Sequence, residues 1–161
     1  MKLDENGNIQ WQKIYGQGYF TSMQQTEDKG YIVGGHYRNI SILKLDENGN
    51  IQWQKTYYSA GEPTYGFSSI QQTLDGGYIF AGKITYFTED FDFNSYPWVV
   101  KLDASGNIQW QKAYECNPSE YFVISEANDI MQTPDKGYIL AGKFKDGFLL
   151  LKLDANGNIQ F

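Results

Sequence analysis

The sequence is poor in the residues on which several classes of protein depend. It has one cysteine and one histidine in 161 residues, so it offers neither an internal disulfide nor a cysteine-based zinc site. No apolar run approaches the roughly 18 residues that a membrane helix needs, and the opening MKLDENGNIQ has no apolar signal core. The net charge is −6 and no basic stretch is present, which argues against a nucleic-acid partner. We therefore expect one soluble globular domain of unknown compartment.

What the sequence has in abundance is glycine, with 17 residues, and aromatic residues, which make up 17% of the chain. Many of them belong to two repeated segments. The first, LDENGNIQWQK and its close variants, begins at Leu3, Leu45, Leu102 and Leu153. The second alternates with the first and reads MQQTEDKGYIVGG from Met23, IQQTLDGGYIFAG from Ile70 and IMQTPDKGYILAG from Ile130. Spacings of roughly 40–50 residues are typical of propeller blades.

Each repeat predicts four short β-strands. In the middle repeat they begin at Phe67 (FSSIQQT), Gly77 (GYIFAGK), Trp98 (WVVKLD) and Asn107 (NIQWQKAY). Apolar residues recur with period 2 rather than 3.6, and Asp/Asn/Gly clusters such as LDGG and DASGN predict the turns. The chain is therefore predicted to be all-β, a single repeat domain over 1–161. Its parts are a partial blade at 1–15 and blades at 19–57, 66–114 and 125–161.

Tandem four-stranded antiparallel units favour a β-propeller; the alternative is a β-trefoil, which also has three four-stranded repeats. The LDENGNIQWQK segments resemble pyrroloquinoline-quinone-type (quinoprotein-like) propeller repeats, in which a strand ending in Leu-Asp precedes a Gly turn and a strand bearing Trp. The matching residues of the first copy are Leu3, Asp4, Gly7 and Trp11. The resemblance implies that the Trp residues dock between neighbouring blades, with Phe161 in the fourth place; they are Trp11, Trp53 and Trp110. The GYIVGG-type strands resemble repeats of secreted bacterial and archaeal propellers, which are often extracellular.

Three blades are fewer than the four to eight that close a propeller. A three-blade wedge would leave two apolar sheet faces open, and such faces associate. We expect a homodimer that closes six blades around a two-fold axis. In it, residues 8–13 of each chain complete the last blade of the other by strand exchange. The alternative is that the chain is a segment of a longer repeat protein.

Strand alternation places the short repeated turns on one face of the disc and the long, variable connections on the other. These connections are acidic and aromatic, and the candidate ligand-binding residues in them are Tyr58, Glu62, Tyr65, Phe87, Glu89, Asp90, Asp92, Tyr96, Glu120 and Tyr121. Aromatic faces attract cations and apolar ring surfaces. A carbohydrate, a peptide or a cationic ligand is one interpretation; packing of the loops by aromatics and solubility from the acids is the other.

Few residues suggest chemistry. Asp90, Asp92 and Asn94 form D-x-D-x-N, the start of a calcium-loop pattern, but the glycine and glutamate of that loop are missing. The repeated D-x-N-G-N is interpreted as a turn closed by its Asp side chain. Glutamines on the first strand of each repeat are expected to line the central channel; they are Gln24, Gln25, Gln71, Gln72 and Gln132.

No pair of carboxylates is set apart as an acid and a base, and a lone His36 and a lone Cys116 have no partners for catalysis. We therefore predict no catalytic residue and no cofactor. The predicted function is that of a non-catalytic binding or scaffold module. The alternative is part of a quinone- or glycan-processing propeller enzyme.

Overall fold

A computed structural model describes residues 1–36, 39–57, 64–87, 93–115 and 125–160. A short hairpin of β1 (Lys2–Leu3) and β2 (Ile9–Trp11) comes first. Blade 1 contains β3 (Tyr19–Gln25), β4 (Tyr31–His36), β5 (Ile40–Leu45) and β6 (Ile51–Tyr57). Blade 2 contains β7 (Thr64–Gln72), β8 (Tyr78–Phe87), β9 (Phe93–Leu102) and β10 (Ile108–Ala113). Blade 3 contains β11 (Ser125–Gln132), β12 (Tyr138–Phe144) and β13 (Gly147–Leu153).

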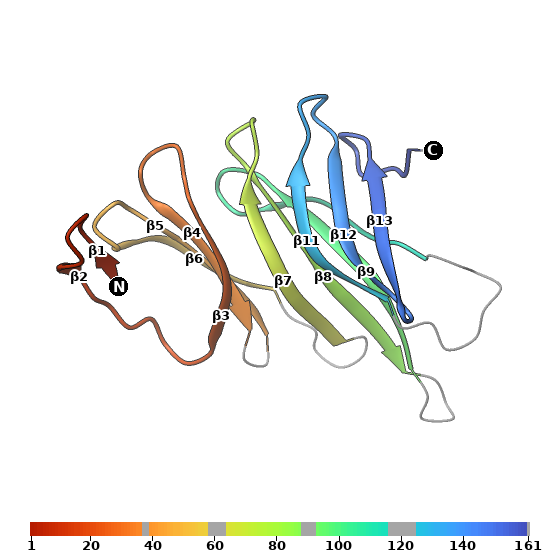
Figure 1. Cartoon of the computed structure of the whole chain (residues 1–161), viewed down its shortest axis with the longest axis horizontal. Helices are drawn as coiled ribbons and strands as arrows, with labels where there is room; N and C mark the ends of the chain where they lie inside the picture. Colours follow the sequence, from red (N-terminus) through yellow and green to blue (C-terminus); the bar gives the residue numbers. More distant parts are fainter. Residues whose placement is uncertain (37–38, 58–63, 88–92, 116–124, 161) are drawn as a thin grey trace.

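The strands of each blade follow one another in the sheet in chain order, and every neighbouring pair is antiparallel. Figure 1 shows the three sheets side by side, and the inner strand of each blade contacts the next, β3 with β7 and β7 with β11. The fold is therefore all-β and propeller-like, as predicted. The trefoil alternative is wrong, because each repeat forms its own sheet. The described residues contain no helix, and so none that is long and apolar enough to cross a membrane.

The two ends of the blades differ in their connections. At the end that we call the turn end, short turns such as 73–77 and 103–107 join the strands. At the opposite loop end lie the strand ends that flank the long connections, among them Tyr57, Thr64, Phe87 and Phe93. Within the sheets this arrangement is the one that strand alternation predicts. Most of the long connections, 58–63, 88–92 and 116–124, are outside the described residues.

The D-x-N-G-N segments are turns, as predicted. In the copy that follows β5, Asp46 Oδ1 accepts the N–H groups of Asn48 and Asn50 at 2.9 and 2.7 Å. Gly49 closes the turn with φ 73°, a left-handed conformation in which glycine carries no Cβ penalty. These hydrogen bonds lower the pKa of Asp46, the bond from the Asn50 backbone contributing most. The carboxylate thus serves the turn itself.

The core lies between the blades. We call the side of a blade that faces the following blade its forward face, and the opposite side its rear face. Ile32, Ile40 and Ile42 on the forward face of blade 1 pack with the aromatic and aliphatic rear face of blade 2, which contributes Phe67, Phe80 and Val100. Gly34 lies directly against the Phe67 ring. A Cβ at this position would stand only 2.2 Å from the nearest ring carbon of Phe67. Burial of these faces provides the main force that stacks the blades.

Candidate functional site

One set of contacts recurs between successive blades on their outer strands. In blade 1, Trp53 of β6 packs on Tyr78 of blade 2, and the Tyr57 hydroxyl donates to the Gly106 carbonyl at 2.6 Å. Lys55 Nζ donates to Asn107 in the same turn. The motif Trp-x-Lys-x-Tyr therefore holds the turn of the following blade. Its other copies are Trp11, Lys13 and Tyr15 on the 46–50 turn and Trp110, Lys112 and Tyr114 on the 154–158 turn.

The three indoles are partly buried at equivalent places, each against the blade that follows. Phe161, the expected fourth member, lies outside the described residues.

A second repeated element is a lysine on the third strand of each blade. Lys101 Nζ donates to the Asp75 carboxylate at 2.9 Å and to the Leu102 carbonyl at 2.9 Å. The equivalent pairs are Lys44 with Asp28 and Lys152 with Asp135. Hydrogen bonds from Lys152 and Thr133 hold the pKa of Asp135 at about 2. For Asp28 and Asp75 burial raises the pKa, but hydrogen bonds outweigh it and the result is again about 2. These ion pairs tie each inner turn to its sheet.

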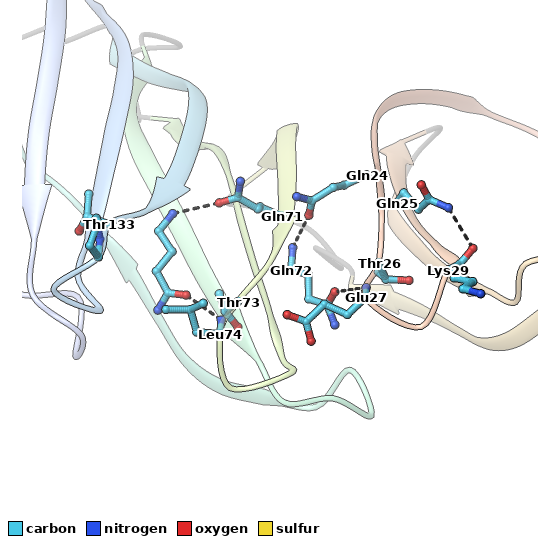
Figure 2. A pocket seen from close by; sticks show the side chains of 12 residues that line it. Gln24, Gln25, Thr26, Glu27, Lys29, Gln71, Gln72, Thr73, Leu74 and Thr133 are labelled. Atoms are coloured by element: carbon cyan, nitrogen blue, oxygen red, sulfur yellow. Dashed lines mark hydrogen bonds between the residues drawn. The ribbon is translucent and has the colours of Figure 1, made fainter. Parts of the chain in front are cut away.

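The glutamines of the inner strands border an open hollow of about 860 Å³ at the turn end. Figure 2 shows them reaching from one blade to the next. Gln24 Oε1 accepts the Gln72 N–H at 2.6 Å, and Gln72 Oε1 accepts the Glu27 N–H at 2.9 Å. Between blades 2 and 3, Gln71 Oε1 accepts the Gln132 N–H and Gln132 Oε1 accepts the Leu74 N–H.

The side-chain carbonyls of Gln24, Gln71, Gln72 and Gln132 are thus used to join two blades, whereas Gln25 donates to the Lys29 carbonyl within its own blade. We call this arrangement the glutamine clamp. Because these oxygens are occupied by the clamp, a structural role explains the glutamines better than the binding of a ligand in the channel does.

The loop end presents a different surface. Strands β8 and β9 form a hairpin whose pairing continues past the last β7 pair, Thr64↔Thr85, to Tyr86↔Asn94 and Phe87↔Phe93. Aromatic rings pair along it: Tyr86 with Tyr96 at 6.1 Å between ring centroids, and Phe87 with Phe93 at 6.3 Å. Tyr86, Phe87 and Phe93 are each more than 40% exposed. The hairpin therefore carries a group of exposed rings on a hydrogen-bonded support.

Three of the predicted loop residues lie in or beside this hairpin. Phe87 is at its tip, Tyr96 lies on β9, and Tyr65 on β7 packs against Trp98 with ring centroids 4.6 Å apart. Burial raises the pKa of Tyr65 and of Tyr96, and the neighbouring Tyr86 adds to both shifts. Both shifts reflect how closely these rings pack at this end of blade 2. The structure brings all three into one region of blade 2.

The remaining predicted residues lie outside the described part of the chain; they are Tyr58, Glu62, Glu89, Asp90, Asp92, Glu120 and Tyr121. Asn94, the third residue of the D-x-D-x-N pattern, is paired with Tyr86 in the hairpin ladder. Among the described residues no three His, Cys, Asp or Glu side chains gather closely enough to hold a metal ion.

Sequence reasoning left Tyr86 out of the predicted site. The signal was present, because TYF and FNSYP alternate with period 2 on either side of the 88–92 segment. That alternation indicates a longer hairpin than the neighbouring repeats have.

No protein-family model matches the chain, and no curated protein matches it either. Solved structures do. A protein of unknown function from Bacteroides caccae is 13% identical, with a TM-score of 0.42 over 99% of this chain and 72% of that one. A putative exo-beta-1,3-galactanase from Bifidobacterium bifidum s17 is also 13% identical, with a TM-score of 0.55 over 99% of this chain and 54% of that one.

The chain thus spans about half the length of the Bifidobacterium protein. At this identity the likeness concerns the fold alone, and it agrees with stacked antiparallel blades.

Proposed function

We propose that this chain is a non-catalytic binding module of a β-propeller, and that its ligand binds at the loop end of blade 2. The observation that carries the proposal is the β8–β9 hairpin. Its exposed Tyr86, Phe87 and Phe93 stand on two ten-residue strands that are paired to the tip. Exposed aromatic groups on a rigid scaffold are typical of binding surfaces.

The ligand class follows from charge and surface. In the sequence, the segment 88–92 between β8 and β9 reads TEDFD and contains three carboxylates. Aromatic faces attract cations through the ring quadrupole, and carboxylates add to that attraction. We propose a cationic peptide or another cationic ligand with an apolar surface. A neutral carbohydrate is the second candidate, since the Bifidobacterium structure with a similar fold is named a putative exo-beta-1,3-galactanase.

The repeats themselves are proposed to be of the pyrroloquinoline-quinone type in architecture. The Trp-x-Lys-x-Tyr motif supports this, because its Trp packs on the following blade beside the glycine turn. The activity of quinone enzymes is not carried over, since it depends on ligands at the centre of a complete ring, and the central glutamine carbonyls here join blades.

A thermal-shift experiment tests the proposal, because a ligand that binds only the folded state raises the melting temperature. The probes are a lysine-rich peptide, simple sugars, a quinone and Ca²⁺. We expect the peptide to raise the melting temperature at low salt and to lose this effect at high salt. The double variant Tyr86→Ala/Phe87→Ala should abolish the shift.

The matched control is Tyr19→Ala, which removes an exposed ring from blade 1 and should leave the shift intact. No shift with any probe, or a shift that the hairpin variant retains, contradicts the proposal.

A further inference from the structure

The first and last blades each leave one apolar face uncovered. On the rear face of blade 1, Phe20 is 44% exposed, whereas the equivalent Phe67, covered by blade 1, is 5% exposed. On the forward face of blade 3, Leu150 is 66% exposed, whereas the equivalent Ile42, covered by blade 2, is fully buried. Other exposed apolar residues at these two surfaces are Met23, Met131 and Phe148. Exposed apolar surfaces of this kind mark sites of association.

The repeated lysine of the third strand shows the same difference in exposure between covered and uncovered faces. The side chains of Lys44 and Lys101 are 5% and 4% exposed, because a following blade covers them. The side chain of Lys152 makes the same ion pair but is 32% exposed. The ion pair of blade 3 is therefore built like those of the other blades, and only the covering blade is missing from it.

Strand β2 occupies the position of an outer blade strand without having its sheet. Trp11 Nε1 donates to the Glu47 carbonyl at 3.2 Å and the Tyr15 hydroxyl donates to the Gly49 carbonyl at 2.7 Å. The Tyr15 bond and the packing of Trp11 on Tyr31 repeat the contacts of Tyr57 and Trp53 by which β6 holds blade 2. However, β6 pairs with β5 all the way from Leu45 to Ile40, whereas in the described part of the chain β2 pairs only with the two residues of β1.

Strand β13 has the complementary deficit. One edge pairs with β12 along its whole length. At the other edge, within the described residues, only the bridge Leu153↔Ile159 and the hydrogen bond from Gln160 N to the Lys152 carbonyl are formed. No described residue pairs with the backbone of Phe148 to Leu151 on that side. Unpaired apolar edges readily recruit another strand.

We propose that blade 3 docks on blade 1 of a second copy, so that β13 pairs with residues 11–15 of that copy and two chains close a six-bladed ring. The contact continues the blade-to-blade interface already formed twice within the chain. Residues 11–15 are already fixed on blade 1 in the place where the outer strand of the preceding blade belongs. The pairing of β13 then displaces β1 from Trp11 of the second copy and Gln160 from the Lys152 carbonyl, and it gains a longer ladder in return.

The register of the new ladder follows from the β5–β6 pair. There Ile42 lies opposite Lys55 and Ser41 opposite Thr56, so Leu150 should lie opposite Lys13 of the second copy and Leu149 opposite Ile14. The forward face of blade 3 would then cover a hollow of about 410 Å³ on blade 1, which is lined by apolar residues such as Phe20, Met23 and Tyr31.

The seam between copies differs from the seams within the chain. Met131 stands where Gln24 and Gln71 supply the accepting oxygen of the glutamine clamp, and Pro134 stands where Glu27 and Leu74 donate a backbone N–H. Blade 3 therefore cannot form the clamp with a following blade. The contact between copies is therefore apolar at the inner strands, and it depends on the pairing of β13 at the outer strands.

Light scattering on the intact chain tests the assembly. We expect a single species of twice the 18.5 kDa of one chain. Leu150→Lys, or Phe148→Lys if the first variant is poorly soluble, should give a folded single chain, because both side chains are exposed within one copy. The control Leu74→Lys changes an equally exposed leucine on an inner turn of blade 2 and should keep the dimer.

Cysteine cross-linking tests the register. In a Cys116→Ser background, Ile14→Cys/Leu149→Cys should oxidise to a covalent dimer, and Ile14→Cys alone should not. A monomeric intact chain, a dimer that survives Leu150→Lys, or a ladder of covalent species larger than two chains overturns the closed two-copy ring. Ligand binding at the β8–β9 hairpin is read out separately and does not enter these measurements.

Discussion

Trp53 of blade 1 packs edge-on against Tyr78 of blade 2, with ring centroids 5.6 Å apart and an interplanar angle of 69°. Trp11 with Tyr31 and Trp110 with Tyr138 repeat this geometry at 5.9 Å. Burial, assisted by the charge of Asp28, raises the pKa of Tyr78 to about 12, so the ring remains neutral under all ordinary conditions. A single aromatic contact, used three times, thus joins the outer strand of one blade to the next.

Replacing Trp53 with alanine should lower the free energy of unfolding by about 3 kcal/mol. This is the lower end of the range for large aromatic truncations, because the indole is only partly buried. Trp53→Phe should recover part of the loss, since a ring remains against Tyr78. Urea unfolding followed by circular dichroism measures both. An alanine variant as stable as the parent would mean that this contact does not hold the blades together.

The buried lysines predict an asymmetry between two aspartates. Asp75→Asn removes the counter-ion of Lys101, whose side chain is 4% exposed, and should cost about 2 kcal/mol. That is less than the ~3–5 kcal/mol for a fully buried pair, since Asp75 is half exposed. In a monomer, Asp135→Asn should lower the free energy of unfolding by less, because the side chain of Lys152 is more exposed to water. Chemical denaturation of both variants in the Leu150→Lys background makes the comparison; equal losses would contradict it.

Stability should fall in acid over a defined range. The pKa of Asp28, Asp75 and Asp135 is about 2 in the folded chain, below the ordinary value of 3.8. A lowered folded pKa contributes stability that is present above pH 3.8 and is lost as the pH falls toward 2. Urea midpoints measured from pH 5 to pH 2 should therefore decrease. The triple Asp→Asn variant should show a shallower slope, although the Asp residues of the outer turns, such as Asp46, retain part of it.

Alanine substitutions at two glycines should distinguish the cost of backbone strain from the cost of a packing clash. Gly7 and Gly106 both have positive φ, 83° and 76°, so alanine at either position should cost about 1 kcal/mol for the left-handed conformation. A Cβ at Gly106 would also stand 3.0 Å from the Trp53 ring, whereas none of the neighbouring atoms lies within 4 Å of one at Gly7. Gly106→Ala should therefore be the more destabilising by about 1 kcal/mol or more. Equal melting temperatures for the two variants would argue against a tight contact at this turn.

Much of the fold could be predicted from local pattern. The repeats, the period-2 alternation in segments such as NIQWQK and the Asp-Gly turns are properties of short stretches, and they suffice to predict strands, turns and the separation of short turns from long connections. The candidate site was predicted less well. Tyr65, Phe87 and Tyr96 were among the predicted residues and lie together in blade 2, but Tyr86 was not predicted, because its exposure depends on how far the β8–β9 ladder continues beyond β7.

The role of the glutamines could not be predicted from the sequence. Gln24 and Gln72 are 48 residues apart and meet only because two inner strands lie side by side. The contact between Tyr57 and Gly106 likewise depends on two blades lying side by side. The exposure of Lys152 depends on the absence of a covering blade within the chain.

The sequence by itself determined that this protein is made of repeated four-stranded units, because strand periodicity and turn chemistry act over a few residues. Only the tertiary structure decided which partners the glutamines, lysines and tyrosines find in the next blade and how exposed each residue of the two open faces is. These contacts join residues that are about 50 positions apart in the sequence, and a pattern over a few residues does not predict which distant residues meet.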